Sequence, residues 1–176
     1  MRNRLFVLFM LFALPWMWSC EKENPIEKQE ERIETYIKTK MSRNPALKLS
    51  QNGDVYYLYT PGDTTVTVST GDSVYFYYAG TLVNDTLKYF DTNDEALANA
   101  LKLDFAPEKF EPLKVVAGNN NLLPGLNIGL NMSHLNDNGE IIFNSDLGFG
   151  EKGVGVVPPF SPLIFKVFII QIKKKS

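Results

Sequence analysis

The sequence predicts an α+β protein: an antiparallel β-sheet with one short central helix, a second helix before the sheet and a third inserted within it. Two patterns carry this prediction. From Val55 onward, β-branched and aromatic residues form short runs that end at turn signals such as Pro61-Gly62-Asp63, which is typical of antiparallel strands. Residues 24–41 instead place apolar side chains three and four positions apart, which is typical of an amphipathic helix.

The first helix is expected to begin at Asn24, which can cap it, with Pro25 at the first helical position. It should end before Asn44-Pro45, and Asn52-Gly53-Asp54 should form a turn. Its apolar positions are Ile26, Ile33, Tyr36, Ile37 and Met41. We interpret this helix as a spacer or a lid.

The following residues contain seven strand-like segments, from which we expect five or six antiparallel strands. Strand-like segments occupy 55–60, 65–69, 73–83, 88–91, 113–117, 140–144 and 163–172. The last segment is apolar on both alternating sets except at Lys166 and Gln171, which favours a central strand covered on both faces. Alanine and leucine content predicts a helix near 93–103, and residues 124–132 predict the short central helix.

The N-terminal residues resemble a bacterial lipoprotein signal. Arg2 and Arg4 precede an apolar run from Leu5 to Trp18, which is too short to span a membrane but suits an export signal. Cys20, the only cysteine, lies where the lipobox of such signals places the lipidated residue. We therefore expect a signal peptide at 1–19, an anchor, tether and helix at 20–52, and a functional domain at 53–176. The alternative is a free, buried cysteine after an ordinary signal.

Charge and cysteine content exclude several functions. The formal net charge is -2, and losing Arg2 and Arg4 with the signal would make it -2 − 2 = -4, so no nucleic-acid partner is expected. A lipidated Cys20 leaves no thiolate for a disulfide, for catalysis or for zinc. The acidic residues after it resemble surface-export signals of the Bacteroidetes. We expect a monomer in the cell envelope, lipid-anchored to the outer membrane and facing the periplasm or the surface.

The polar residues predict neither a cofactor nor a metal. His134 is the only histidine and lies in a loop-like run, so we interpret it as a lone surface residue rather than part of a catalytic relay. Residues 137–140 lack the ligand spacing of a calcium loop and predict a hairpin turn. The glycines at 148–155 precede prolines rather than a helix, so they do not predict a phosphate loop. We therefore expect the function to depend on apolar and aromatic residues.

Six further motifs are recognisable by their order along the chain. They are Gly71–Leu82, Tyr89–Asn93, Gly118 with Leu122–Gly125, Gly129 with Met132, Asp146–Gly150, and Val157–Pro159 with Ser161–Phe165. This order resembles FKBP-type peptidyl-prolyl cis-trans isomerases, and most closely the lipid-anchored members of the Bacteroidetes. The resemblance covers roughly 71–172. It implies a curved antiparallel β-sheet wrapped around the short helix at 124–132, with a binding pocket between them and an insertion at 92–112.

The resemblance also implies the activity, the isomerisation of X-Pro bonds in unfolded or flexible proteins. Rotation about a peptide bond meets a barrier of ~18–20 kcal/mol from resonance. A pocket that excludes water favours the twisted, less charge-separated amide and lowers this barrier without acids, bases or metals. The partners implied are proline-containing polypeptide clients, together with the membrane reached through the anchor.

Site residues follow from the same resemblance. Tyr78, Phe90 and Phe165 would form aromatic walls, with Phe149 beside them and Asp91 as the single carboxylate at the edge. Leu122 and Leu123 would line the rim, Val156 and Val157 the top, and Leu126 the floor; residues 151–155 would be a flap. The Leu123 backbone N–H would hold a substrate carbonyl. For each apolar residue ordinary core packing is the alternative, and for Asp91 a turn.

Two positions depart from the family pattern. Leu126 replaces the usual tryptophan floor, a loss of roughly 50–100 Å² of contact, or about 1–2 kcal/mol. Phe149 replaces a tyrosine whose hydroxyl donates to bound peptide, a loss of about 1 kcal/mol. These changes leave open a peptide-binding module or holdase chaperone with weak or no isomerase activity, and the anchor leaves open a structural part of an outer-membrane assembly.

Overall fold

The computed structural model describes residues 24–83, 88–103 and 107–176. Its elements are α1 (Pro25–Arg43), β1 (Lys48–Asn52), β2 (Val55–Thr60), β3 (Asp63–Thr67), β4 (Ser73–Leu82), β5 (Tyr89–Thr92), α2 (Glu95–Leu101), η1 (Pro107–Phe110), β6 (Leu113–Val116), α3 (Pro124–Leu130), β7 (His134–Leu135), β8 (Asn138–Phe143), η2 (Ser145–Leu147) and β9 (Leu163–Lys173). The predicted signal peptide, Cys20 and residues 104–106 of the predicted insertion lie outside the described residues.

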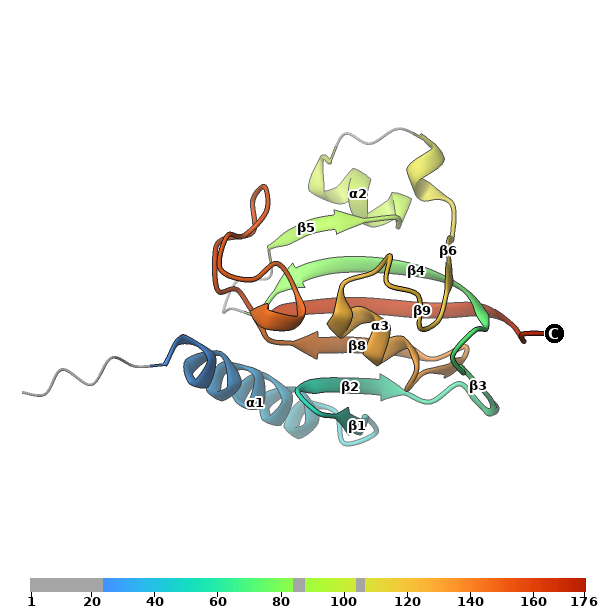
Figure 1. Cartoon of the computed structure of the whole chain (residues 1–176), viewed down its shortest axis with the longest axis horizontal. Coiled ribbons are helices and arrows are strands. Elements are labelled where there is room, and N and C mark those ends of the chain that lie inside the picture. Colours follow the sequence, from blue (N-terminus) through green and yellow to red (C-terminus); the bar gives the residue numbers. More distant parts are fainter. Residues whose placement is uncertain (1–23, 84–87, 104–106) are drawn as a thin grey trace, which may run out of the picture.

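A seven-stranded antiparallel sheet forms the centre of the molecule (Figure 1). The strand order is β1-β2-β8-β9-β4-β5. β5 and β6 pair with the same edge of β4, β5 at residues 79–81 and β6 at residues 73–76. The central position predicted for the last strand is confirmed, since β9 lies between β8 and β4. The predicted count of five or six strands is too low. All seven strand-like segments form strands, and two more strands occur that the pattern does not predict: β1, a polar edge strand, and β7, which pairs with β3 and spans only two residues.

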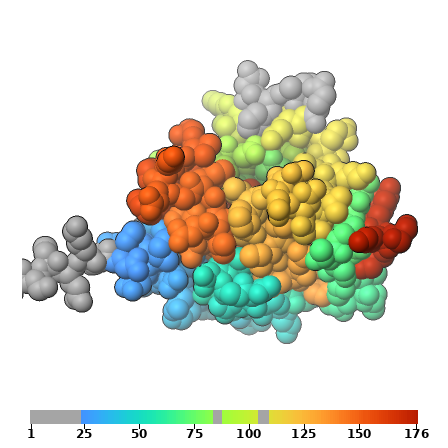
Figure 2. Space-filling model, viewed as in Figure 1, coloured from blue at the N-terminus to red at the C-terminus, as the bar shows by residue number. Residues whose placement is uncertain are grey.

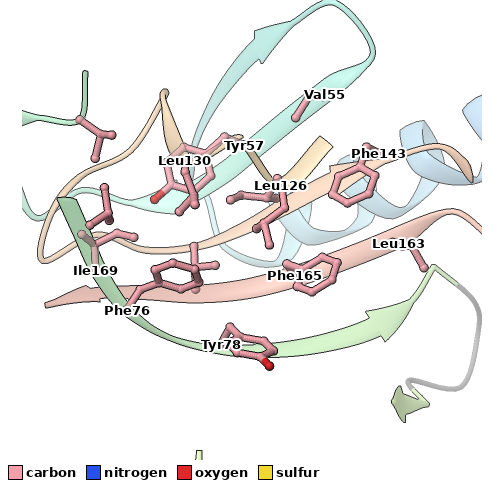
Figure 3. Close-up of a cluster of buried hydrophobic side chains, with 14 of the residues drawn as sticks. Val55, Tyr57, Phe76, Tyr78, Leu126, Leu130, Phe143, Leu163, Phe165 and Ile169 are labelled. Atoms are coloured by element: carbon pink, nitrogen blue, oxygen red, sulfur yellow. The ribbon is translucent and has the colours of Figure 1, made fainter. Parts of the chain in front are cut away.

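The short helix α3 packs against one face of the sheet. A Cβ atom at Gly125 would collide with the Phe143 ring, and one at Gly129 with Ile141, so the two glycines let α3 lie directly on β8. Leu126 and Leu130 then enter the main apolar core, which Figure 3 shows between α3 and the strands. The predicted sheet around a central helix is confirmed.

Helix α1 lies on the opposite face of the sheet. Ile33 and Ile37 of α1 pack against three strand residues, Leu58, Ile142 and Ile164. The residues next to these three along the strands belong to the main core, which therefore lies on the other face. The start of the helix is confirmed, because Asn24 Oδ1 accepts from the Ile26 N–H at 3.0 Å. The lid interpretation is wrong, since α1 is separated from the α3 side by the sheet. Among the described residues, none of the helices has the length and apolar character needed to cross a membrane.

The insertion between β5 and β6 carries α2 and η1 and is attached to the sheet by Asn93. Its buried side chain accepts from the Tyr78 N–H at 2.6 Å and donates to the carbonyls of Phe76 at 3.2 Å and Glu111 at 3.0 Å. Asn93 therefore joins both ends of the insertion to β4. The predicted helix is confirmed as α2, capped by Asp94.

The prediction of a hairpin turn at 137–140 is wrong, because β7 before the turn pairs with β3 and β8 after it pairs with β2 and β9. Asp137 is fully buried, and its carboxylate accepts from the Tyr57 hydroxyl at 3.1 Å and the Gly62 N–H at 2.8 Å. His134 Nδ1 lies 3.1 Å from the same carboxylate, and its side chain is only 19% exposed. The prediction of a lone surface histidine is wrong, because the turn folds back against β2 and buries the carboxylate that the imidazole contacts.

Candidate functional site

A cavity of about 750 Å³ opens on the α3 side of the sheet. All ten residues predicted for the site line it: Tyr78, Phe90, Asp91, Leu122, Leu123, Leu126, Phe149, Val156, Val157 and Phe165. Leu113, Asn120, Asn121, Pro124, Val154 and Gly155 complete the lining. The structure therefore brings the predicted residues together; their individual roles stay predictions.

Four aromatic rings form the wall of the cavity. Phe90 meets Phe165 and Phe149 edge to face, with ring centroids 5.7 and 5.9 Å apart. The ring centroids of Tyr78 and Phe165 are 6.2 Å apart, and both side chains point inward from neighbouring strands (Figure 3). Gly80 makes this arrangement possible, since a Cβ atom there would come within 2.6 Å of the Phe90 ring. Edge-to-face packing holds the rings rigidly around an apolar space.

The floor and rim come from α3 and the chain that leads into it. Leu126 is buried at the base of the cavity, and Leu122 and Leu123 are half-buried beside it. Leu123 occupies the N-cap position of α3. A helix makes no intrahelical use of the N–H at that position, so the Leu123 amide is suited to a ligand carbonyl.

A charged cluster lies at the cavity edge. The Tyr78 hydroxyl donates to Asp91 Oδ2 at 2.8 Å, and Lys109 Nζ lies 3.0 Å from Asp91 Oδ1. Lys109 Nζ also donates to the Tyr78 hydroxyl oxygen at 2.8 Å and sits 5.4 Å from the centre of that ring. Asp91 therefore enters the site as a neutralised ion pair rather than as an isolated carboxylate.

Sequence reasoning missed Lys109. It belongs to η1 at the end of the insertion, 18 positions beyond Asp91, and no motif marks it. Partial burial lowers the pKa of Lys109, but hydrogen bonds to Tyr78 and Asp91 outweigh it and leave the pKa raised. Burial raises the pKa of Tyr78, and the Asp91 contacts add to this against the opposing effect of Lys109. Both groups therefore stay protonated at neutral pH.

The loop at 148–160 covers one side of the cavity. Val154 and Val157 exchange two backbone hydrogen bonds of 3.1 and 2.9 Å across a tight turn. Gly153 and Gly155 there have positive φ angles of 62° and 56°, which glycine adopts without strain. The turn leaves Val154 and Val156 58% and 78% exposed beside the cavity mouth. The loop stands next to the α3 region on the face shown in Figure 2.

The fold and site together define a class of protein. An antiparallel sheet around a short helix presents an aromatic cavity with one ion-paired carboxylate. The described part of the chain has no cluster of three or more His, Cys, Asp or Glu side chains that could hold a metal. An aromatic, largely apolar cavity of this kind is suited to binding an apolar ring.

Residues 64–170 match the profile of the FKBP-type peptidyl-prolyl cis-trans isomerases. The chain belongs to this family and is an enzyme of this type. It is 28% identical over 113 residues to FK506-binding protein 1 of Yarrowia lipolytica, covering 64% of this chain and 91% of that protein. It is 26% identical over 159 residues to a probable FKBP-type peptidyl-prolyl cis-trans isomerase of Haemophilus influenzae, covering 90% of this chain and 58% of the relative.

Solved structures show the same fold. The crystal structure of FkpA from Escherichia coli matches with a TM-score of 0.57 and 23% identity, covering 84% of this chain and 61% of that one. The N-terminal domain of FKBP42 from Arabidopsis thaliana matches with a TM-score of 0.57 and 16% identity, covering 72% of this chain and 93% of that one.

Proposed function

We propose that this protein isomerises X-Pro bonds in unfolded or flexible polypeptides of the cell envelope while a lipid on Cys20 holds it to the outer membrane. The observation that carries the catalytic part is the aromatic cavity, whose walls and floor would shield a bound proline ring from water. Removing water disfavours the charge-separated planar amide more than the twisted one, which lowers the rotational barrier.

Each part of the site has a role in this proposal. Tyr78, Phe90 and Phe165 enclose the proline ring over Leu126. The Leu123 N–H holds a substrate carbonyl, and the paired Asp91 orders the Tyr78 hydroxyl at the edge. Uncatalysed X-Pro exchange takes tens of seconds or longer at 25 °C. A protein of the cell envelope whose folding is limited by X-Pro isomerisation is therefore a suitable client.

The test compares the isomerisation rates of the chain from residue 21 onward and of its Phe90→Ala, Asp91→Ala variant. Two substrates are used: a short peptide with one X-Pro bond, and a protein whose refolding is limited by prolyl isomerisation. We expect acceleration by the unaltered protein on both substrates. No acceleration above the variant on either substrate would exclude the enzymatic function.

A second function, that of a holdase or peptide-binding module, is favoured by specific residues. Phe149 lacks the hydroxyl usual in the family, and Val154 and Val156 expose apolar surface beside the cavity. Suppression of client aggregation without any isomerisation would favour this function. Loss of that suppression in a Val154→Ser, Val156→Ser variant would then assign it to the loop.

The anchor rests on the residues around Cys20. A Cys20→Ala variant should move from the membrane fraction to the soluble fraction of the envelope. Unchanged fractionation would show that the lipid is not what holds the protein. Protease treatment of intact cells then separates a periplasmic position from a surface-facing one, because only a surface protein is accessible.

A further inference from the structure

Gln29 is a fully buried polar residue on α1 that the site described so far does not use. Its amide oxygen accepts from the Ser145 backbone N–H at 2.8 Å, and its amide nitrogen donates to the Ser145 hydroxyl at 3.1 Å. The two residues are 116 positions apart. This pair joins the N-terminal half of α1 to η2, at the base of the loop that follows.

Ser145 in turn organises the segment that carries Phe149. Its carbonyl accepts from the Gly148 N–H at 2.9 Å and from the Gly150 N–H at 2.8 Å. Gly150 then accepts from the Phe160 N–H at 3.1 Å, which closes the loop. Phe149 lies between the two glycines and meets Phe90 edge to face in the cavity wall.

We propose that Gln29 is a positioning residue for the cavity: by holding Ser145 it fixes residues 148–150 and keeps the Phe149 ring against Phe90. The family match begins at residue 64, so this support comes from a helix outside the matched region. Figures 1 and 2 show the same relationship, with the beginning of α1 directly beside the orange loop. The proposal deepens the proposed function, on which its catalytic consequence rests.

The physical reason is that the Ser145 N–H would have no substitute partner if the Gln29 amide oxygen were removed. Ser145 is itself buried, so water cannot replace the Gln29 oxygen without opening the contact between α1 and η2. A buried N–H without a partner is costly, and the backbone would shift to satisfy it. The glycines at 148 and 150 offer little resistance to such a shift, and Phe149 would move with them.

The test uses Gln29→Met in the full chain, because methionine keeps the side-chain length and removes both hydrogen bonds. The first measurement is NMR amide exchange of Gly148 and Gly150, which we expect to become at least about tenfold faster relative to core amides. The second is affinity for a tetrapeptide with a central Leu-Pro bond, which we expect to fall about three- to tenfold. Isomerisation should show a raised KM with a smaller change in kcat.

Ile33→Val is the matched control. It loosens the same helix against the sheet without touching Ser145. If it accelerates exchange at Gly148 and Gly150 as much as Gln29→Met does, or if Gln29→Met leaves that exchange unchanged, the proposal is overturned. The exchange measurement needs no activity. An unaltered protein that does not isomerise would therefore refute the proposed function while leaving the positioning result intact.

Discussion

The hydroxyl of Tyr78 on β4 and the carboxylate of Asp91 on β5 are joined by a 2.8 Å hydrogen bond inside the cavity wall. The two strands pair directly, with Gly80 opposite Asp91. Lys109 completes the group from the insertion. The polar edge of the pocket is thus a charge-balanced unit built from two strands and a segment inserted between β5 and β6.

Lys109→Met should change substrate preference more than stability. The Lys109–Asp91 pair is about one-third exposed, so its loss should lower the free energy of unfolding by only about 0.5–1 kcal/mol. The pocket edge then carries an unbalanced negative charge, which repels an acidic residue before proline. We expect the ratio of kcat/KM for Leu-Pro over Glu-Pro peptides to rise about two- to fivefold.

Lys114→Met is the control for that substitution, since Lys114 lies over the Tyr75 ring and does not line the cavity. An equal change in preference from both variants would show that overall charge, rather than the neutralisation of Asp91, sets it.

Phe149→Tyr should strengthen peptide binding. The ring already lines the cavity beside Phe90, and the substitution supplies the hydroxyl donor usual at this family position. One neutral hydrogen bond contributes about 1 kcal/mol, or about fivefold in the dissociation constant measured by calorimetry. Phe168→Tyr adds the same hydroxyl on an exposed side chain that does not line the cavity, and should leave the constant unchanged. Tighter binding by both variants, or by neither, would contradict this reasoning.

Leu126→Trp should also raise affinity. Leu126 forms the base of the cavity, and an indole would extend the apolar floor by roughly 50–100 Å², or about 1–2 kcal/mol, which is about 5- to 30-fold in affinity. The melting temperature should be measured alongside, because overpacking against the core would lower it. Preserved melting with unchanged affinity would show that the floor does not contact the ligand.

Gly129→Ala should destabilise the protein by about 1–3 kcal/mol in denaturant unfolding, because the new methyl group collides with Ile141. This cost should exceed the gain of about 1 kcal/mol in helix propensity. Combined with Ile141→Ala, the two losses should be less than additive, since the smaller partner makes room. Additive losses would mean that the close approach of α3 to β8 is not the cause.

Asp72→Asn should lower stability at neutral pH but not in acid. The buried carboxylate accepts from Lys174 Nζ at 2.7 Å and from the Lys175 N–H at 2.9 Å, which holds the end of β9. The Lys174 hydrogen bond chiefly lowers the pKa of Asp72, reinforced by backbone donors. Its stabilisation is therefore complete above the unfolded pKa of about 3.9 and disappears as pH falls through the lower folded value. Melting curves of the two proteins should begin to converge below about pH 4 and should meet only below the folded pKa of Asp72. A constant difference would assign the effect to packing.

The architecture could be predicted from the sequence, and the residues around the cavity from its resemblance to the FKBP family. Alternating apolar strands, the short helix and the ordered motifs predicted a sheet around α3, and all ten predicted site residues line one cavity. This succeeds because the residues lie within motifs whose backbone geometry is local: strand alternation directs Tyr78 and Phe165 to the same face, and glycines such as Gly80 leave space for Phe90.

Which distant residues meet could not be predicted and follows from the three-dimensional fold. Lys109 reaches Asp91 because Asn93 joins both ends of the insertion to β4, and Gln29 reaches Ser145 because α1 packs across the outer face of the sheet. The burial of Asp137 against the Tyr57 hydroxyl, 80 positions away, has the same origin. These contacts depend on where long connections return to the sheet, and chain spacing does not encode the path of a connection. A polar residue such as Gln29 therefore looks ordinary on a helix until the fold buries it.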